Sequence, residues 1–160
     1  VVGLSMGGAI TLWLASRHSD LSGIVCINPT TKSSASKLAG ARLAVKTGKK
    51  SLPAIGSDIS DPAVKESSYD ATPLAAAVSL FADGLKPLSK KYGSIKVPLL
   101  LFTATNDHVV NPKESDFLVS KYAGSVERVT LERSFHVATQ DVEKETIHAK
   151  ALEFAKRVTA

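Results

Sequence analysis

The chain has 160 residues, of which 44% are hydrophobic and 22% charged, a composition ordinary for one soluble globular domain with a buried core. No apolar run approaches the roughly 18 residues of a membrane span, and no basic stretch followed by an apolar run marks a signal peptide. The single cysteine, Cys26, excludes an intrachain disulfide and argues against a cysteine-ligated metal site. A cytoplasmic location is the favoured interpretation.

The first element along the chain is a Gly-x-Ser-x-Gly motif at residues 3–7. In a nucleophile elbow of this kind the serine, here Ser5, sits on a sharp turn from a buried strand into a helix. We expect Gly3 and Gly7 both to be small because the backbone on either side of the turn approaches closely. A helix over residues 8–18 should follow, and its N-terminus favours negative charge developing beside Ser5.

The elements that follow alternate between strand and helix. Residues 97–104 are apolar on both faces of the expected strand, which is typical of a parallel sheet covered by helices. The alternation predicts an α/β fold. The expected elements are a strand ending at Asn28, a short helix near 36–47, helical spacing over 73–92, a strand over 97–104, a helix over 112–122, a strand over 126–132 and a closing helix over 141–158 with Asp141 as its N-cap.

Residues 30–69 lack strong periodicity and are rich in Ser, Lys, Gly and Pro, so we expect an insertion between two core elements. Between Thr31 and Ser57 this segment carries six basic residues and no acidic ones. Such a segment could face an anionic membrane surface, but a solvated helix face is the favoured interpretation.

A serine nucleophile needs a histidine to take its proton. His18 lies at a helix end and His148 inside a helix, so structural or solvated roles are favoured for both. His108 follows a predicted strand. His136 is the better candidate because it lies in the loop between the strand over 126–132 and the closing helix, where catalytic groups collect in open α/β sheets.

The histidine in turn needs an orienting carboxylate. Asp107 follows the strand over 97–104, whereas Asp116 and Asp141 have sufficient structural explanations in or before helices. Ser5, Asp107 and His136 then occur in the chain order of α/β-hydrolase triads.

Three segments resemble the bacterial carboxylesterase and monoacylglycerol lipase branch of the α/β-hydrolase superfamily: residues 3–9, 106–112 and 134–141. The resemblance implies an α/β-hydrolase fold of which this chain holds the C-terminal half, strands five to eight of a mostly parallel sheet, with residues 30–69 as a small cap. It implies Ser5 as nucleophile, Asp107 as acid, His136 as base and the backbone N–H of Met6 as an oxyanion-hole donor. Phe135 departs from the family pattern, which often has glycine there. The first four strands of the family are also missing, so we expect residues 1–160 alone to be marginally folded and weakly active.

The expected activity is hydrolysis of a carboxylic ester, a short- or medium-chain acyl ester or a monoacylglycerol, through an acyl-serine intermediate. Three alternatives stay open: thioester hydrolysis or acyl transfer by the same triad, a non-catalytic fragment, and an anionic-surface binder. No motif for phosphate, metal or nucleic acid is present, so we expect a small-molecule acyl ester as partner, no cofactor, no metal and no nucleic acid.

Overall fold

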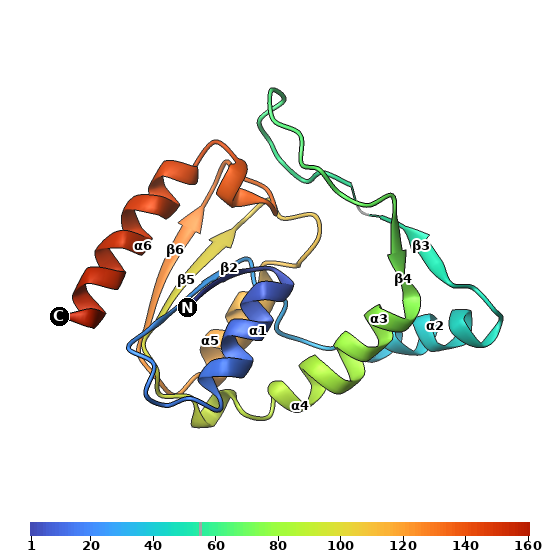
Figure 1. Ribbon diagram of the computed structural model, residues 1–160, viewed down its shortest axis with the longest axis horizontal. Helices are drawn as coiled ribbons and strands as arrows, with labels where there is room; N and C mark the ends of the chain where they lie inside the picture. The colour runs from blue at the N-terminus through green and yellow to red at the C-terminus, as the bar shows by residue number, and fades with distance from the viewer. Residues whose placement is uncertain (55) are drawn as a thin grey trace.

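A computed structural model, which describes residues 1–54 and 56–160, places four parallel strands side by side in the order β1–β2–β5–β6 (Figure 1). The strands are β1 (Val2–Leu4), β2 (Ile24–Ile27), β5 (Leu99–Ala104) and β6 (Val126–Leu131). All three pairings are parallel, so the carboxyl ends of the strands lie at one end of the sheet. The predicted α/β class with a parallel sheet is confirmed.

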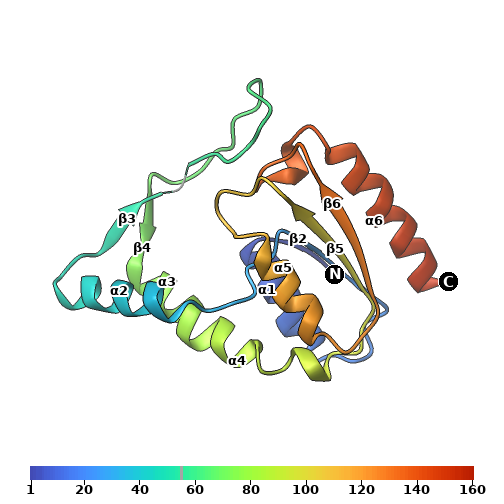
Figure 2. The ribbon, with the colours of Figure 1, turned by 180° about the vertical axis from the view of Figure 1, so that it is seen from behind.

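Helices cover both faces of this sheet. Figures 1 and 2 show α1 (Met6–Ala15) and α5 (Lys113–Lys121) on one face and α6 (Lys144–Thr159) on the other. Successive strand residues point to opposite faces, and β2 and β5 are apolar at every position except Thr103, so both strands contribute to two cores. Ile24, Cys26, Leu99 and Leu101 pack with α1 and α5, and Val25, Ile27, Leu100 and Phe102 pack with α6.

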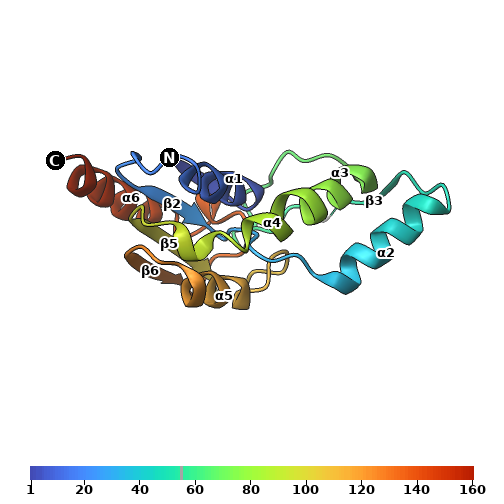
Figure 3. The same ribbon diagram turned by 90° about the horizontal axis from the view of Figure 1, so that it is seen from below.

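An outer lobe extends away from the sheet between β2 and β5 (Figure 3). It comprises α2 (Ala35–Lys46), the short antiparallel strands β3 (Ser51–Pro53) and β4 (Ala71–Pro73), and α3 (Leu74–Ser79), which contacts α2. A π-helical turn (Leu80–Leu85), α4 (Lys86–Leu88) and a 3₁₀ turn (Tyr92–Ser94) lead back to the sheet. The predicted helix near 36–47 is present as α2. The predicted helical segment over 73–92 is present as α3, the π-helical turn, α4 and the start of the 3₁₀ turn.

The lobe is therefore larger than the segment expected to form an insertion. The expected insertion ends at Tyr69, but β3 pairs with β4, which lies after that residue. Ile55, within the expected insertion, lies outside the described residues. The basic side chains of Arg42, Lys46 and Lys49 are exposed.

The prediction that Asp141 caps the closing helix is wrong. Helix α6 begins at Lys144, and Glu143 occupies its N-cap position. Asp141 is instead buried, at 1% exposure, among loops at the carboxyl end of the sheet. In the part of the chain that the structure describes, no helix has the length and apolar character needed to cross a membrane.

Candidate active site

Ser5 occupies a strained turn between β1 and α1. Its φ of 55° and ψ of −117° lie in a region that L-residues rarely adopt, at a cost of about 1–3 kcal/mol. Surrounding hydrogen bonds hold the turn in place: the Ser5 N–H donates to the Ile27 carbonyl at 2.9 Å, and the Ser5 carbonyl accepts the Thr30 N–H at 3.2 Å. The serine is thereby fixed to the carboxyl end of β2.

Glycines make this turn possible, although not the pair that the sequence suggested. A Cβ on Gly3 would lie 2.2 Å from the Gly7 carbonyl oxygen, so residue 3 has no room for a side chain. A Cβ on Gly8 would lie 2.7 Å from the Cβ of Pro29. A Cβ on Gly7 would meet nothing within 4 Å, so the expectation that Gly7 must be small is wrong. The close approach is at Gly8 instead, where α1 passes Pro29 in the segment after β2.

The structure brings Asp107 and His136 together at the end of the sheet where Ser5 lies. Asp107 follows β5, His136 follows β6, and Asp107 Oδ2 lies 2.7 Å from His136 Nδ1. Their side chains are 2% and 8% exposed, so the contact is screened little by water. Ser5 Oγ makes no hydrogen bond to the His136 ring in the described part of the chain.

The second oxygen of Asp107 fixes the carboxylate and the tautomer of its partner. Oδ1 accepts the backbone N–H groups of Val109 and Val110 at 2.8 and 2.7 Å. With Oδ2 also an acceptor, the proton of the His136 contact must sit on Nδ1. In the neutral ring with this tautomer, Nε2 carries the lone pair and can accept a proton.

Asn28, which sequence reasoning missed, connects β2, β5 and the His136 loop. It adopts a left-handed backbone conformation with φ 44°, and it is buried. Its Oδ1 accepts the N–H of Ala104 at 2.7 Å, and its Nδ2 donates to the carbonyl of His136 at 2.8 Å. An asparagine directly before Pro29 at a strand end was the available signal, since asparagine tolerates this conformation.

Two more carboxylates hold the loop that carries His136. Asp141 accepts the Phe135 N–H at 2.8 Å and the N–H and hydroxyl of Ser60, both at 2.9 Å. Glu143 accepts the N–H groups of Arg133 and Ser134 at 2.9 and 2.8 Å.

Both carboxyl groups have altered acidity. Burial works to raise the pKa of Asp141 and of Glu143, but the hydrogen bonds to each carboxylate outweigh burial, so each pKa lies below its ordinary value. Both groups are therefore charged when they hold the loop at neutral pH.

The other histidines have different partners. The ring of His108 is 62% exposed, with Nδ1 2.7 Å from Asp58 Oδ1 and its edge against the ring of Phe135. His148 lies on the exposed surface of α6 beside Glu145, and His18 is exposed after α1. Among the described residues only His136 is paired with the acid expected for a triad.

A cavity of about 460 Å³ opens beside the serine turn. Met6, the residue after Ser5, contributes to its wall, together with Val109 and Val110 from the loop after β5. The outer lobe contributes Thr72, Pro73, Ala76 and Ala77 to the wall, and the π-helical turn that follows it contributes Leu80 and Phe81. As the first residue of α1, Met6 has no acceptor for its N–H within the helix. A largely apolar cavity, lined also by a few polar residues such as Lys32 and Glu114, thus adjoins a backbone donor at a helix N-terminus.

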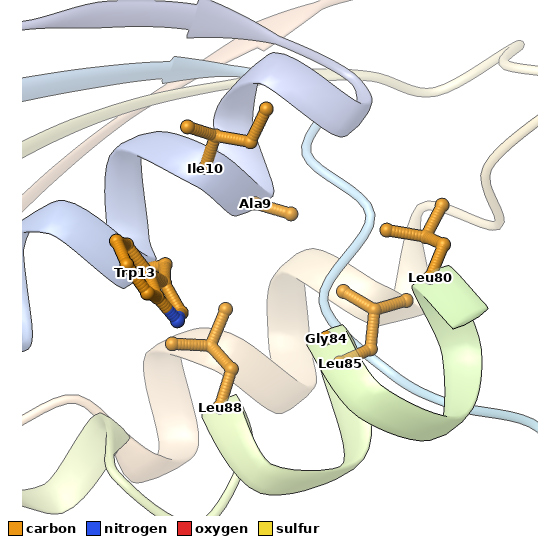
Figure 4. Close-up of a pocket in the computed structure, with 7 residues that line it drawn as sticks. All are labelled: Ala9, Ile10, Trp13, Leu80, Gly84, Leu85 and Leu88. Atoms are coloured by element: carbon orange, nitrogen blue, oxygen red, sulfur yellow. The ribbon is translucent and has the colours of Figure 1, made fainter. Parts of the chain in front are cut away.

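A second cavity, of about 290 Å³, lies on the outer side of α1. Figure 4 shows Ile10 and Trp13 of α1 opposite Leu80, Leu85 and Leu88. Neither cavity is lined by Ser5, Asp107 or His136, but Met6, the neighbour of Ser5, lines the first cavity and not this one, whose wall is apolar. Binding sites usually add a few polar groups that orient the ligand, so the cavity beside Met6 is the better candidate for substrate.

Comparisons with known proteins agree with this geometry. Residues 1–143 match the family model described as serine aminopeptidase, S33 (Hydrolase_4). The chain is 39% identical over 159 residues to the thermostable monoacylglycerol lipase of Bacillus sp. (strain H-257), covering 96% of this chain and 61% of the relative.

Solved structures give the same result. A structure from work on LipS and LipT, two metagenome-derived lipolytic enzymes, superimposes with a TM-score of 0.89 at 34% identity, covering 98% of this chain and 64% of that one. The monoacylglycerol lipase of Paleococcus ferrophilus shares the fold, with a TM-score of 0.72 at 21% identity over 99% of this chain and 67% of its own. The chain spans less than two thirds of the length of the first two relatives. The sequence match, the strained serine turn and the parallel half-sheet together show that the chain belongs to the serine aminopeptidase S33 family of α/β-hydrolases.

Proposed function

We propose that the chain carries the catalytic groups of a carboxylic-ester hydrolase, with Ser5 as nucleophile, His136 as general base and Asp107 as the orienting acid. The observation that carries the proposal is the buried 2.7 Å contact between Asp107 and His136, at the same end of the sheet as a strained serine. Strain at a non-glycine turn persists where the surrounding structure imposes it, and it concentrates at active sites.

In the proposed reaction, Ser5 Oγ attacks the ester carbonyl carbon and its proton passes to His136 Nε2. The carbonyl oxygen becomes an oxyanion and accepts the Met6 N–H, with the N-terminus of α1 adding favourable potential. His136 then gives the proton to the departing alkoxide, leaving an acyl group on Ser5. Water attacks this acyl group and loses a proton to His136, which returns that proton to Ser5 Oγ as the bond from the acyl carbon to Oγ breaks and the carboxylic acid leaves. Asp107 stabilises the imidazolium of each step without accepting its proton.

The cavity beside Met6 supports an acyl chain as the substrate group. Its apolar wall from the outer lobe would bury hydrocarbon, and its closeness to the Met6 N–H would place the ester carbonyl at the serine turn. We propose short- or medium-chain acyl esters or monoacylglycerols as substrates, in line with the relative from Bacillus sp. (strain H-257), a monoacylglycerol lipase. Residues 30–69 would act as part of the cap over this cavity.

The test is covalent labelling of the purified chain with a fluorophosphonate probe, which reacts with an activated serine. We expect labelling of the native chain and none of Ser5→Ala. Ser120→Ala is the matched control because Ser120 is an exposed residue of α5 whose hydroxyl, among the described residues, bonds only the Phe117 carbonyl. Equal labelling of the native chain and Ser5→Ala would refute the role of Ser5.

Substrate class follows from turnover of monoolein, p-nitrophenyl butyrate and an acyl-CoA by the same preparation. Faster turnover of the two oxygen esters supports the proposal. A preference for the acyl-CoA would replace it with thioester hydrolysis.

A further inference from the structure

Asp58 lies outside the candidate triad, in the loop that joins β3 to β4. That loop belongs to the outer lobe, and Figures 1 and 2 show it reaching from the lobe toward the loops that follow β5 and β6. The side chain of Asp58 is only 12% exposed, although the neighbouring loop residues Gly56 and Ser57 are largely open to solvent. A carboxylate is costly to bury without partners, so its contacts are informative.

Three hydrogen-bond donors surround this carboxylate, and they come from the two loops of the proposed acid and base. Oδ2 accepts the backbone N–H of His136 at 3.0 Å and the backbone N–H of His108 at 3.1 Å. Oδ1 lies 2.7 Å from Nδ1 of the His108 ring. One oxygen therefore joins the base itself to the residue that directly follows the acid, Asp107.

From these contacts we propose that Asp58 is a positioning residue, which sets the separation of Asp107 and His136 by binding the backbone of both loops through one carboxylate oxygen. The inference rests on the proposed function of the triad. Asp58 acts through His136 and has no contact of its own with the reacting atoms.

Asp58 accepts the backbone N–H of His136, and no other residue in the described part of the chain does so. Asn28 holds the carbonyl of His136, and Asp58 holds its N–H, so both peptide groups of the histidine are fixed. Loss of the Asp58 contact would leave the His136 N–H partly buried without its acceptor. The His136 peptide would then lose one of the contacts that fix its position relative to Asp107, and small misplacements of catalytic groups are expensive in rate.

Adjacent contacts fasten the same part of the lobe to the His136 loop. The Asp58 carbonyl accepts the N–H of Val137 at 3.0 Å. Ser60 and Asp61 donate their backbone N–H groups to Asp141 at 2.9 and 3.1 Å. Residues 58–61 thus remain anchored when the Asp58 side chain is removed, so its substitution tests the carboxylate rather than the attachment of the lobe.

The experiment compares the rate of fluorophosphonate labelling of Ser5 in the native chain with that in Asp58→Ala and Asp58→Asn. Asp58→Ala removes all three acceptor contacts, and we expect labelling about tenfold to a hundredfold slower. Asp58→Asn keeps one carbonyl oxygen that can accept both backbone N–H groups, so its rate should stay within a few-fold of the native rate. A near-native labelling rate in Asp58→Asn is expected if residue 58 acts by accepting the two backbone N–H groups.

Asp61→Ala is the matched control. Its carboxylate lies three residues further along the same loop but, within the part of the chain that the structure describes, accepts only the N–H of Ala63, so the labelling rate of this variant should be unchanged. Circular dichroism, recorded under the labelling conditions and through a thermal melt, shows whether each variant is folded. If Asp58 had only a structural role, Asp58→Ala would have a lower melting temperature, but its folded molecules would label at the native rate. That result would overturn the proposal.

A second readout does not depend on activity. The Nδ1 proton of His136, held by Asp107, should give a low-field proton resonance in the native chain and in Asp58→Asn. The resonance should be weakened or shifted in Asp58→Ala. If the native chain failed to label, the proposed function would fail, and an unchanged resonance in folded Asp58→Ala would separately refute the positioning role. Should Asp58→Ala not fold, Asp58→Glu keeps the charge but moves the carboxylate by one methylene, and a native labelling rate there would refute the proposal.

Discussion

Replacing Asp107 with asparagine tests the proposed triad, because it changes how many hydrogen bonds this side chain can accept and adds a donor. In the native chain Oδ1 of Asp107 accepts two backbone N–H groups, from Val109 and Val110, while Oδ2 accepts the His136 ring N–H. The amide of the substituted side chain has only one oxygen. If that oxygen serves the two backbone donors, the amide NH₂ must face Nδ1 of His136.

The histidine then has to change tautomer. Nδ1 would accept a hydrogen bond from the amide, and the ring proton would move to Nε2, which could no longer take the proton of Ser5. The flipped amide is worse, because its NH₂ would face two backbone N–H donors in a site where the native side chain is 2% exposed. Only the first arrangement gives every donor a hydrogen-bond partner, and in it His136 can no longer act as the base.

We expect Asp107→Asn to lower the rate of Ser5 acylation by about 10⁴-fold, or roughly 5 kcal/mol of transition-state stabilisation, the size seen when this tautomer is lost in serine proteases. The assay is the second-order rate of fluorophosphonate labelling at pH 8, with the melting temperature measured in parallel. Asp116→Asn is the control because Asp116 lies on the surface of α5 and pairs with Arg128. A loss of less than tenfold in a folded Asp107→Asn chain would refute the tautomer argument.

Three other outcomes are expected. Gly3→Ala should destabilise the chain by about 1–3 kcal/mol or more in urea unfolding, because the added Cβ would lie 2.2 Å from the Gly7 carbonyl oxygen, whereas Gly7→Ala should be tolerated sterically. The depressed pKa of Asp141 means that its stabilising contribution is complete above the ordinary value of 3.8 and is lost as pH falls through the lower folded value. Asp141→Asn should therefore flatten the dependence of the free energy of unfolding on pH below about pH 4, and an unchanged slope would contradict this. Burial raises the pKa of the Cys26 thiol to about 12, so iodoacetamide at pH 8 should modify Cys26 only after unfolding, and rapid modification of the native chain would show that β2 opens readily.

Much of the sheet, and the positions of Asp107 and His136 at the carboxyl end of it, could be predicted from the sequence because the signals are local. Residues 99–104 are apolar at nearly every position, as expected of a strand covered on both faces, and the structure buries all six. Asp107 and His136 each follow a strand in a parallel sheet, so the fold alone places them at one end. Their contact across 29 residues follows from the topology.

The supporting contacts could not be predicted because they depend on long-range packing. Asp58 lies 50 and 78 positions from the residues that its carboxylate holds, and nothing in its local sequence distinguishes it from a solvated loop aspartate. For Asp141 the local pattern was misleading: its position before a helix suggested an N-cap, but its carboxylate binds Ser60 and Phe135 instead. Strand β3 was missed because three exposed residues ending in proline carry no alternation.

The amide of Asn28 has a consequence for how this position can vary. One end of the amide must accept, from Ala104, and the other must donate, to His136, while the backbone remains left-handed. Aspartate would direct an acceptor at a carbonyl, glutamine would be one methylene too long, and glycine would supply the backbone but neither bond. Of these four residue types, only asparagine meets the three demands together. A saturation library screened for activity should therefore recover asparagine at this position in preference to aspartate, glutamine and glycine.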